Sequence, residues 1–267
     1  MQRVFTDNPR TEAIMKENSS CSLEKGSGMD RNCIVCGRPL VYFREERMLE
    51  CRICHKIKPA NASCEEGHFV CDDCHSGGAA AVLELLLHSR EKDPVLLLLQ
   101  AVQLPGVHLH GPEHHSSLPC VLLSAYHNCG GQIDLEKSLT EAWNRGKKIP
   151  GGACGYLGVC GAAAGAGIFA SIVSGATPLN GKQWATPQKL TAACLEAMAE
   201  IGGPRCCKRT TRIAVECAAD FAEKVFGVSM PVSRPACTYW QRNGECIRGR
   251  CPFFPKKKVL VRREVRR

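Results

Sequence analysis

The stretch that organises this chain runs from residue 33 to residue 74 and reads CIVCGRPLVYFREERMLECRICHKIKPANASCEEGHFVCDDC. Its cysteines and one histidine form four close pairs: Cys33 and Cys36, Cys51 and Cys54, Cys64 and His68, Cys71 and Cys74. A Cys-x2-Cys turn can present both sulfurs to one ion about 2.3 Å away, and four such ligands close a tetrahedral structural site. The spacing therefore predicts two zinc ions with eight protein ligands. It leaves open whether the pairs combine sequentially or interleave.

The composition of the chain is that of a globular protein. Of its 267 residues 44% are hydrophobic and 23% are charged, and the sparse aromatics favour close helix packing over a β-sandwich. The 19 cysteines exceed what core filling needs, while the polar first thirty residues lack the apolar segment of a secretory signal. We therefore expect a cytoplasmic protein of a reducing, oxygen-poor cell, whose thiols bind metal or do thiol chemistry.

The pattern along the chain predicts a mainly α protein: a small zinc-ribbon or treble-clef-like module followed by a bundle of about seven helices. Glycines interrupt the uncharged run 149–181, so we expect a buried helix there and no membrane span. The expected helices are 79–89, 94–104, 118–128, 134–148, 158–174, 187–201 and 204–226. The expected divisions are a flexible arm 1–30, a zinc module 31–76, a helical domain 77–230, a cysteine-bearing tail 231–255 and a basic tail 256–267.

Three motifs in the helical part could carry chemistry. Glu113 and His114, in the run Gly-Pro-Glu-His-His, are candidate metal ligands or general bases, unless this run is only a solvated loop. Cys154 and Cys160 lie in a glycine-rich loop that frees backbone amides for an anion or a cluster, or are merely packed thiols. Cys206 and Cys207 lie among Arg205, Lys208 and Arg209 at an expected helix start, where the helix dipole and the cations are expected to lower their thiol pKa values.

A fourth motif lies in the tail. Cys237, Cys246 and Cys251 resemble the first three ligands of a Cys3His finger without its histidine, and Cys251 precedes a proline, which is common at iron–sulfur ligands. These thiols could bind a cluster alone, could recruit Cys206 or Cys207, or could be isolated structural cysteines. An iron–sulfur cluster is therefore a second expected cofactor besides zinc.

The three helical motifs precede or open alternate helices of the expected bundle. In an up-and-down bundle such helices begin at the same end, so His114, Cys160 and Cys206 are expected to converge on one pole. The positive ends of three helix dipoles would then point at one thiolate-rich site that favours anions.

Four motifs together resemble an uncharacterised cysteine-rich family of anaerobic bacteria and archaea. They are CIVCGRPL at 33–40, CEEGHFVCDDCH at 64–75, GPEHH at 111–115 and GGPRCCKR at 202–209. The resemblance covers about residues 31–255. It implies a domain of unknown function that is sometimes joined to an S-adenosylmethionine-dependent methyltransferase, but it implies no activity and no site residues.

The segment from Cys64 to Cys74 also looks like the middle of a RING-type finger, in which the zinc sites interleave. The sequence departs from that pattern because Cys51 and Cys54 come before this segment, whereas a RING finger has its last Cys-x2-Cys after it. Ubiquitin-ligase activity therefore does not follow from the likeness.

These observations favour a metal-binding protein with two structural zinc sites. Its helical domain is expected to carry a thiolate or iron–sulfur site for sulfur, methyl or redox chemistry on a small anionic substrate. We assign catalytic roles to Cys206, Cys207, His114 and Glu113, and cofactor binding to Cys154, Cys160, Cys237, Cys246 and Cys251. One alternative is a zinc-finger adaptor, which would bind either nucleic acid, through the basic tail, or a partner enzyme such as a methyltransferase. The other is a metal- or cofactor-trafficking protein.

Overall fold

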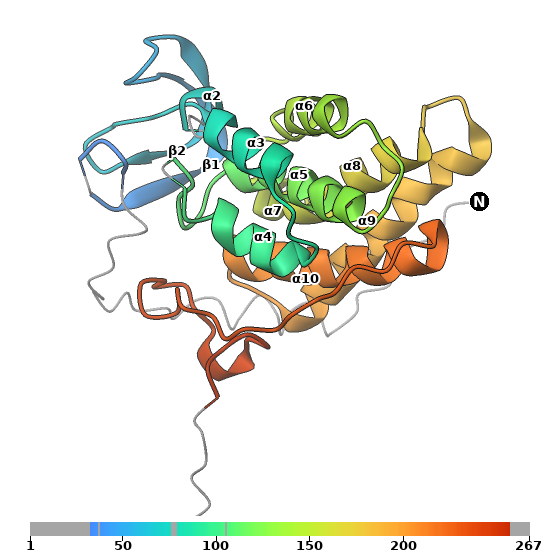
Figure 1. Cartoon of the computed structure of the whole chain (residues 1–267). Helices are drawn as coiled ribbons and strands as arrows, with labels where there is room; N and C mark the ends of the chain where they lie inside the picture. Colours follow the sequence, from blue (N-terminus) through green and yellow to red (C-terminus); the bar gives the residue numbers. More distant parts are fainter. Residues whose placement is uncertain (1–32, 37, 76–78, 105, 257–267) are drawn as a thin grey trace, which may run out of the picture.

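The computed structural model describes residues 33–36, 38–75, 79–104 and 106–256. The expected arm 1–30 and almost all of the basic tail lie outside these residues. The described chain is mainly α-helical with one small two-stranded sheet, which confirms the predicted fold class. The metal module (residues 33–75) lies at one end of the helical body (residues 79–226), and the C-terminal segment (residues 228–256) runs along the body's lower side in Figure 1.

The metal module is built on an antiparallel hairpin of β1 (Leu40–Glu50) and β2 (Ile57–Cys64). The start of β1 pairs with the end of β2, Leu40 opposite Cys64, and Glu50 pairs with Ile57 at the other end. The pairing is irregular between Tyr42 and Arg47. After β2 the chain returns to form a bridge from Phe69 to Cys51 and then the one-turn helix α2 (Asp72–His75).

The described chain contains seven helices of eight residues or more. They are α3 (Ala79–His88), α4 (Pro94–Ala101), α5 (Glu113–Asn128), α6 (Leu135–Gly146), α8 (Gly161–Ser174), α9 (Gly181–Ile201) and α10 (Cys207–Phe221), with the short α7 (Ala153–Tyr156) between α6 and α8. The last helix continues as one π-helical turn, Ala222–Phe226.

Local signals explain where several helices begin and end. Asp93 caps α4 by accepting hydrogen bonds from the backbone amides of Val95 and Leu96, and Pro94 takes the first helical position. Asp134 caps α6 in the same way. Gly175, at φ +63°, ends α8 in the left-handed conformation that glycine adopts most easily. These ends agree with the sequence-based expectations.

Several expected helix starts were wrong. The helix α9 begins at Gly181, six residues before the expected Pro187, and α8 begins at Gly161, three residues after the expected start. The third expected helix begins five residues earlier than predicted, so Glu113, His114 and His115 form the first turn of α5 and not a loop before it. The last helix begins at Cys207, because Cys206 has an extended backbone (φ −151°, ψ 102°) and occupies the cap position. Pro204 therefore precedes the helix and does not open it.

The centre of the helical body is α5, which is buried along nearly its whole length. Helices α3, α4, α6, α8 and α10 pack around it (Figure 1). Small residues allow some of these helices to approach closely: a Cβ at Gly146 would lie 2.5 Å from the Cα of Ser116. Because other helices pack around α5, even the polar side chains of its first turn, Glu113, His114 and His115, are buried.

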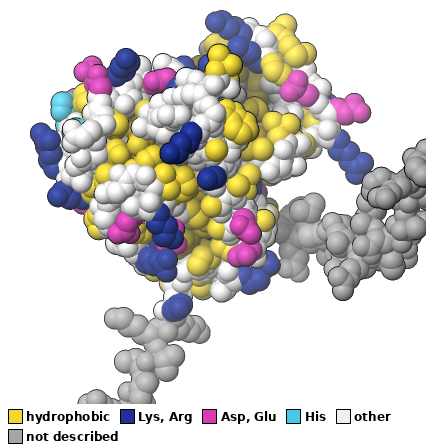
Figure 2. All heavy atoms as spheres, turned by 90° about the vertical axis from the view of Figure 1, so that its right-hand side faces the viewer, with side chains coloured by type: hydrophobic (Ala, Val, Ile, Leu, Met, Phe, Trp, Pro, Cys, Tyr) yellow, Lys and Arg dark blue, Asp and Glu magenta, His cyan; other side chains and the backbone are white. Residues whose placement is uncertain are grey.

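The uncharged run 149–181 contains the helices α7 and α8. No helix of the described residues is both long enough and apolar enough to cross a membrane. The face at the right of Figure 1 carries hydrophobic side chains among lysine, arginine and acidic ones (Figure 2).

Candidate metal centres and the chamber between the modules

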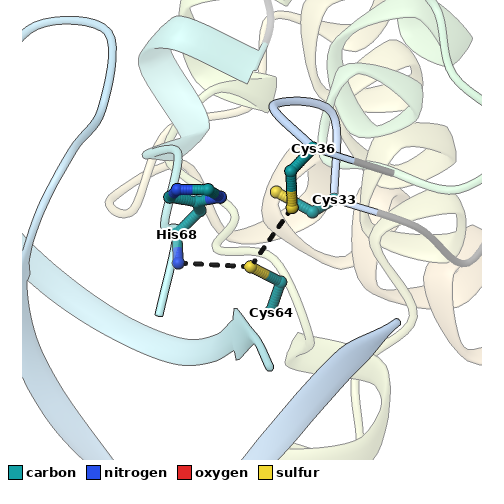
Figure 3. Close-up of side chains that lie close together, drawn as sticks. All are labelled: Cys33, Cys36, Cys64 and His68. Atoms are coloured by element: carbon teal, nitrogen blue, oxygen red, sulfur yellow. Dashed lines mark hydrogen bonds between the residues drawn. The ribbon is translucent and has the colours of Figure 1, made fainter. Parts of the chain in front are cut away.

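The first group of metal-ligating side chains is Cys33, Cys36, Cys64 and His68, whose ligand atoms all lie within 4.8 Å of one another. The four side chains point toward a common centre from the turn before β1, the end of β2 and the turn after it (Figure 3). The Sγ atoms of Cys36 and Cys64 are 3.7 Å apart. The Nδ1 atom of His68 is buried and has no hydrogen-bond partner, which is the state expected of a nitrogen that binds a metal.

The second group is Cys51, Cys54, Cys71 and Cys74, again with all ligand atoms within 4.8 Å. The Sγ atoms of Cys54 and Cys71 are 3.8 Å apart. The pairs of ligands therefore interleave along the chain, first with third and second with fourth. The hairpin explains this order, because Leu40 pairs with Cys64 at one end while the bridge from Phe69 to Cys51 brings the last pair to the other.

Backbone amides support both groups. The amide of His68 donates to the Sγ atom of Cys64 at 3.2 Å, and the amide of Cys71 donates to the Sγ atom of Cys51 at 3.3 Å. Burial alone would raise the pKa of Cys51, but these backbone hydrogen bonds lower it to about 6. At Cys51 the fold therefore favours the thiolate, which is the form that binds metal, whereas burial raises the pKa of Cys71 and that of Cys74 in the same group.

A third group, His75, His108 and Glu113, lies where the metal module meets the helical body. Its three ligand atoms also lie within 4.8 Å of one another. The Nδ1 atom of His75 is 3.2 Å from one carboxylate oxygen of Glu113, and the Nδ1 atom of His108 is 3.4 Å from the other. Although it is close to Glu113, His108 Nδ1 is buried without a hydrogen bond of good geometry. Two histidines and a carboxylate are a ligand set for zinc or iron that leaves coordination positions open.

The carboxylate of Glu113 is held firmly for this role. It is 1% exposed and accepts a hydrogen bond from the backbone amide of His108 at 2.7 Å. Burial would raise the pKa of Glu113, but its close contacts with the His108 and His75 rings outweigh burial and keep that pKa below its usual range. The carboxyl group is therefore charged in the folded chain.

A chamber of about 720 Å³ opens between the metal module and the helical body. His75 and His108 lie in its wall, together with the thiols of Cys154 and Cys207. Its cationic lining residues are Arg205, Lys208 and Arg242. The volume suits a small-molecule ligand, and the cations favour an anionic one.

Contacts between the modules close the chamber. Asp72 of α2 accepts a hydrogen bond from the amide of Gly151 at 2.8 Å, and Tyr156 donates to the carbonyl of Phe43 at 2.6 Å. The guanidinium of Arg205 lies over the ring of Tyr42, 5.2 Å from its centroid. Residues from both modules therefore shape the chamber.

The structure brings together the beginnings of α5, α8 and α10. Lys208 of α10 donates to the carbonyl of His108 at 3.0 Å, and the amide of Cys207 donates to His110 at 3.4 Å. A side chain at Gly161, the first residue of α8, would overlap the ring of His115. The predicted convergence of these three helix ends is thus present in the fold.

The candidate residues do not all lie in the chamber. His114 is 1% exposed, and its Nε2 atom hydrogen-bonds to the carbonyl of His108 at 3.0 Å, so it supports the His108 backbone from behind. Burial lowers the pKa of His114 to about 3, and the ring is therefore neutral. Cys206 lines a different cavity with Cys237, Cys246 and Cys251. Cys160 lies close enough to Cys154 and Cys207 to affect their titration.

The expected lowering of the thiol pKa values at Cys206 and Cys207 was wrong. Burial raises the pKa of Cys207 to about 12 and also raises that of Cys206, although nearby arginines act in the opposite direction. The free energy that desolvation costs a thiolate is larger here than the stabilisation that the helix end and the cations provide. As free thiols, both cysteines are therefore protonated near neutral pH.

The site residues assigned from the sequence included neither His75 nor His108. A signal for His75 existed, because it directly follows the last cysteine of the metal module and is carried by the same helical turn. Its partners lie 33 and 38 positions along the chain, and only the fold brings them together.

A comparison with known protein families assigns most of the chain to one family. Residues 82–254 match a family of unknown function, DUF5714. The chain belongs to this family. No curated protein and no solved structure matches it. The DUF5714 region contains His108, Glu113 and the helical body, whereas the eight ligands of the metal module and His75 lie before it.

Proposed function

We propose that this chain is a metal-dependent enzyme that acts on a small anionic substrate in the chamber between its two modules. The observation that carries the proposal is the third metal-ligating group, because His75 and His108 line a chamber with three cationic residues and the buried Glu113 lies within 4.8 Å of both. Three protein ligands leave open positions for substrate or water, as catalytic sites require and closed four-ligand sites do not.

The first two groups are proposed to hold structural zinc ions. Four ligands at 2.3 Å from a tetrahedral ion are separated from each other by about 3.8 Å. The Sγ–Sγ distances of 3.7 Å and 3.8 Å match this value. The two ions hold the metal module in shape and so place His75 beside Glu113.

The chamber offers two kinds of group to a substrate. Arg205 lines the chamber and lies 3.6 Å from Glu245, and Lys208 lines the chamber as well. The thiols of Cys154 and Cys207 complete the reactive lining. These groups suit sulfur, methyl or redox chemistry on a carboxylate, phosphate or sulfur oxyanion.

The metal part of the proposal is tested by titrating the anaerobically purified full chain with cobalt(II). Zinc content is measured first, and visible absorption then reports cobalt at the third group. We expect one cobalt ion beyond the two structural zinc ions in the unaltered chain, and none in His108→Ala or Glu113→Gln. His88→Ala is the matched control, because His88 is an exposed histidine on α3 that pairs with Glu84. Equal cobalt binding in all four proteins would show that the third group is only a hydrogen-bonded cluster.

The anion part is tested with inorganic phosphate as the probe, by calorimetry. Arg205→Gln is expected to weaken phosphate binding, whereas Arg234→Gln, on an exposed arginine paired with Glu216, is expected not to. Absence of both the third metal and phosphate binding, with salt-sensitive binding of RNA or DNA, would favour the adaptor alternative. Capture of a methyltransferase by a chain without these two properties would favour a partner-binding role.

A further inference from the structure

Four cysteines line a second cavity, between the start of α10 and the C-terminal segment. Its lining includes Cys206, the cap residue of α10, and Cys237, Cys246 and Cys251 from the C-terminal segment. The remaining lining is largely apolar, with Leu98, Val102 and the rings of Trp240, Phe253 and Phe254 among it. Residues more than thirty positions apart in the chain thus contribute thiols to one space.

The arrangement of these thiols differs from that of the two zinc groups. In the described part of the chain, no three of them bring their sulfurs within 4.8 Å of one another, so they do not form a single-ion site. They nevertheless line one cavity. Sulfurs that share a cavity but stand apart fit a polynuclear centre, in which each thiolate binds its own metal atom.

Three buried cations that form no ion pair with a carboxylate among the described residues point to a missing anion. Lys208, Arg209 and Arg212 line this cavity and are each 5–6% exposed. Among the described residues their hydrogen bonds go to backbone carbonyls and to His114, and none pairs with a carboxylate. The Nε atom of Arg212 is buried with no hydrogen-bond partner at all. Buried charge of one sign is unfavourable unless a counter-charge compensates it.

The ligand positions are fixed by the fold. Cys237 donates its amide to the carbonyl of Phe253 at 2.7 Å, which holds the two ends of the C-terminal segment together. The amide of Arg248 donates to the Sγ atom of Cys246 at 3.4 Å, and the side-chain amide of Asn243 donates to the Sγ atom of Cys206 at 3.3 Å. Such N–H···S contacts stabilise thiolates that carry a cluster.

We propose that Cys206, Cys237, Cys246 and Cys251 bind a [4Fe–4S] cluster, each through its Sγ atom. Each thiol releases its proton as its sulfur–iron bond forms, so a core of charge 2+ with four thiolates carries a net charge of about −2. That charge compensates the buried cations of the cavity. Among the ligand sets that the sequence leaves open, this one recruits Cys206 and leaves Cys207 to the chamber.

The cluster lies next to the chamber without being part of it. Cys206 and Cys207 are adjacent in sequence, yet Cys206 lines the cavity and Cys207 lines the chamber. Asn243 connects the two sides, because its side chain contacts both Cys206 and His110. The proposed cluster shares no ligand with the third metal group, so either site can bind its metal without the other.

The test is anaerobic reconstitution of the full chain with equal amounts of ferrous and ferric iron and with sulfide, which supplies the oxidation level of a 2+ core, followed by desalting and assay of iron and acid-labile sulfide. We expect four irons and four sulfides per chain, with a visible absorption band that bleaches on reduction with dithionite. Cys206→Ser is the decisive variant, because serine is a good helix cap and should preserve α10 while removing the thiolate. It is expected to lose most of the iron and sulfide, as is Cys246→Ser.

Cys129→Ser is the matched control, since Cys129 is a partly buried cysteine at the end of α5, away from this cavity. Zinc content and far-ultraviolet circular dichroism show whether each variant is folded. Wild-type iron and sulfide in a folded Cys206→Ser protein would overturn the assignment of Cys206. Iron that appears without sulfide, or is removed by desalting, would overturn the cluster itself.

Discussion

Gly111 and Glu113 show how one small residue sets the position of a buried charge. A side chain at position 111 would overlap the carboxylate of Glu113, so only glycine leaves room for it there. Gly111→Ala is therefore expected to displace the carboxylate and to lower cobalt(II) affinity at the third group about 10- to 100-fold, as the loss of metal-orienting contacts does elsewhere. Cobalt titration of the full chain measures this.

Gly181→Ala is the control for this substitution, because a Cβ at Gly181 would meet nothing within 4 Å. Both variants should keep two zinc ions and the wild-type circular dichroism spectrum. Unchanged cobalt affinity in Gly111→Ala would mean that Glu113 does not ligate the ion.

The direction of the pKa shifts of Cys206 and Cys207 could not be predicted from the neighbouring residues in the sequence. Their cationic neighbours and the nearby helix end are visible in the sequence, but their burial is not. Burial depends on the C-terminal segment and the metal module packing over the start of α10, and those contacts join residues far apart in the chain. The sign of a pKa shift could therefore not be predicted from charge pattern alone.

At the level of elements, α2 connects a structural site to the candidate catalytic one. This helix has four residues, too few to be stable alone, and Cys71 and Cys74 fix it to the second metal group. Cys54→Ser should therefore remove the second zinc ion, release α2 and His75, and weaken cobalt binding at the third group about 10-fold or more.

Cys36→Ser is the paired variant, because it damages the first metal group, whose ligands are not on α2. We expect it to lose one zinc ion with a smaller effect on cobalt binding. The relation between α2 and the third group would be disproved by equal cobalt loss in the two variants, or by none in Cys54→Ser.

The packing of α8 against α5 gives a prediction on stability. Because a side chain at Gly161 would overlap the ring of the buried His115, Gly161→Ala is expected to destabilise the fold by about 1–3 kcal/mol. Urea denaturation measures this change, with Gly181→Ala again as the reference. A midpoint for Gly161→Ala equal to that of the reference would show that His115 moves aside without cost.

Element-level prediction from the sequence succeeded where local chemistry decides the outcome. The caps Asp93 and Asp134 are local signals, and both helices begin where these residues indicate. The first turn of α5 could not be predicted this way, because Glu113, His114 and His115 are polar but buried, and their partners come from distant segments. The pairing of the metal ligands likewise needed the hairpin register.

For the whole molecule, the two modules differ in what stabilises them. The helical body has a continuous apolar core, formed chiefly by α3, α4, α5, α6, α8, α9 and α10. The metal module has a two-stranded sheet with exposed hydrophobic residues and few buried ones, and such a small sheet is marginal without further support. Structural zinc contributes folding free energy of about 10–16 kcal/mol in comparable modules. Metal removal should therefore unfold the metal module before the helical body.

Hydrogen exchange with mass spectrometry can follow this order after zinc removal by a chelator. We expect rapid deuterium uptake across residues 38–75 and in the loop at 147–157, whose contacts from Gly151 and Tyr156 to the metal module would be lost. Protection in α5 and α8 should remain, because their packing in the apolar core involves none of the eight ligands of the metal module. Readdition of zinc should restore protection in both regions. If α5 and α8 lose protection together with the metal module, the two modules unfold as one unit, and the chamber cannot open by release of the metal module alone.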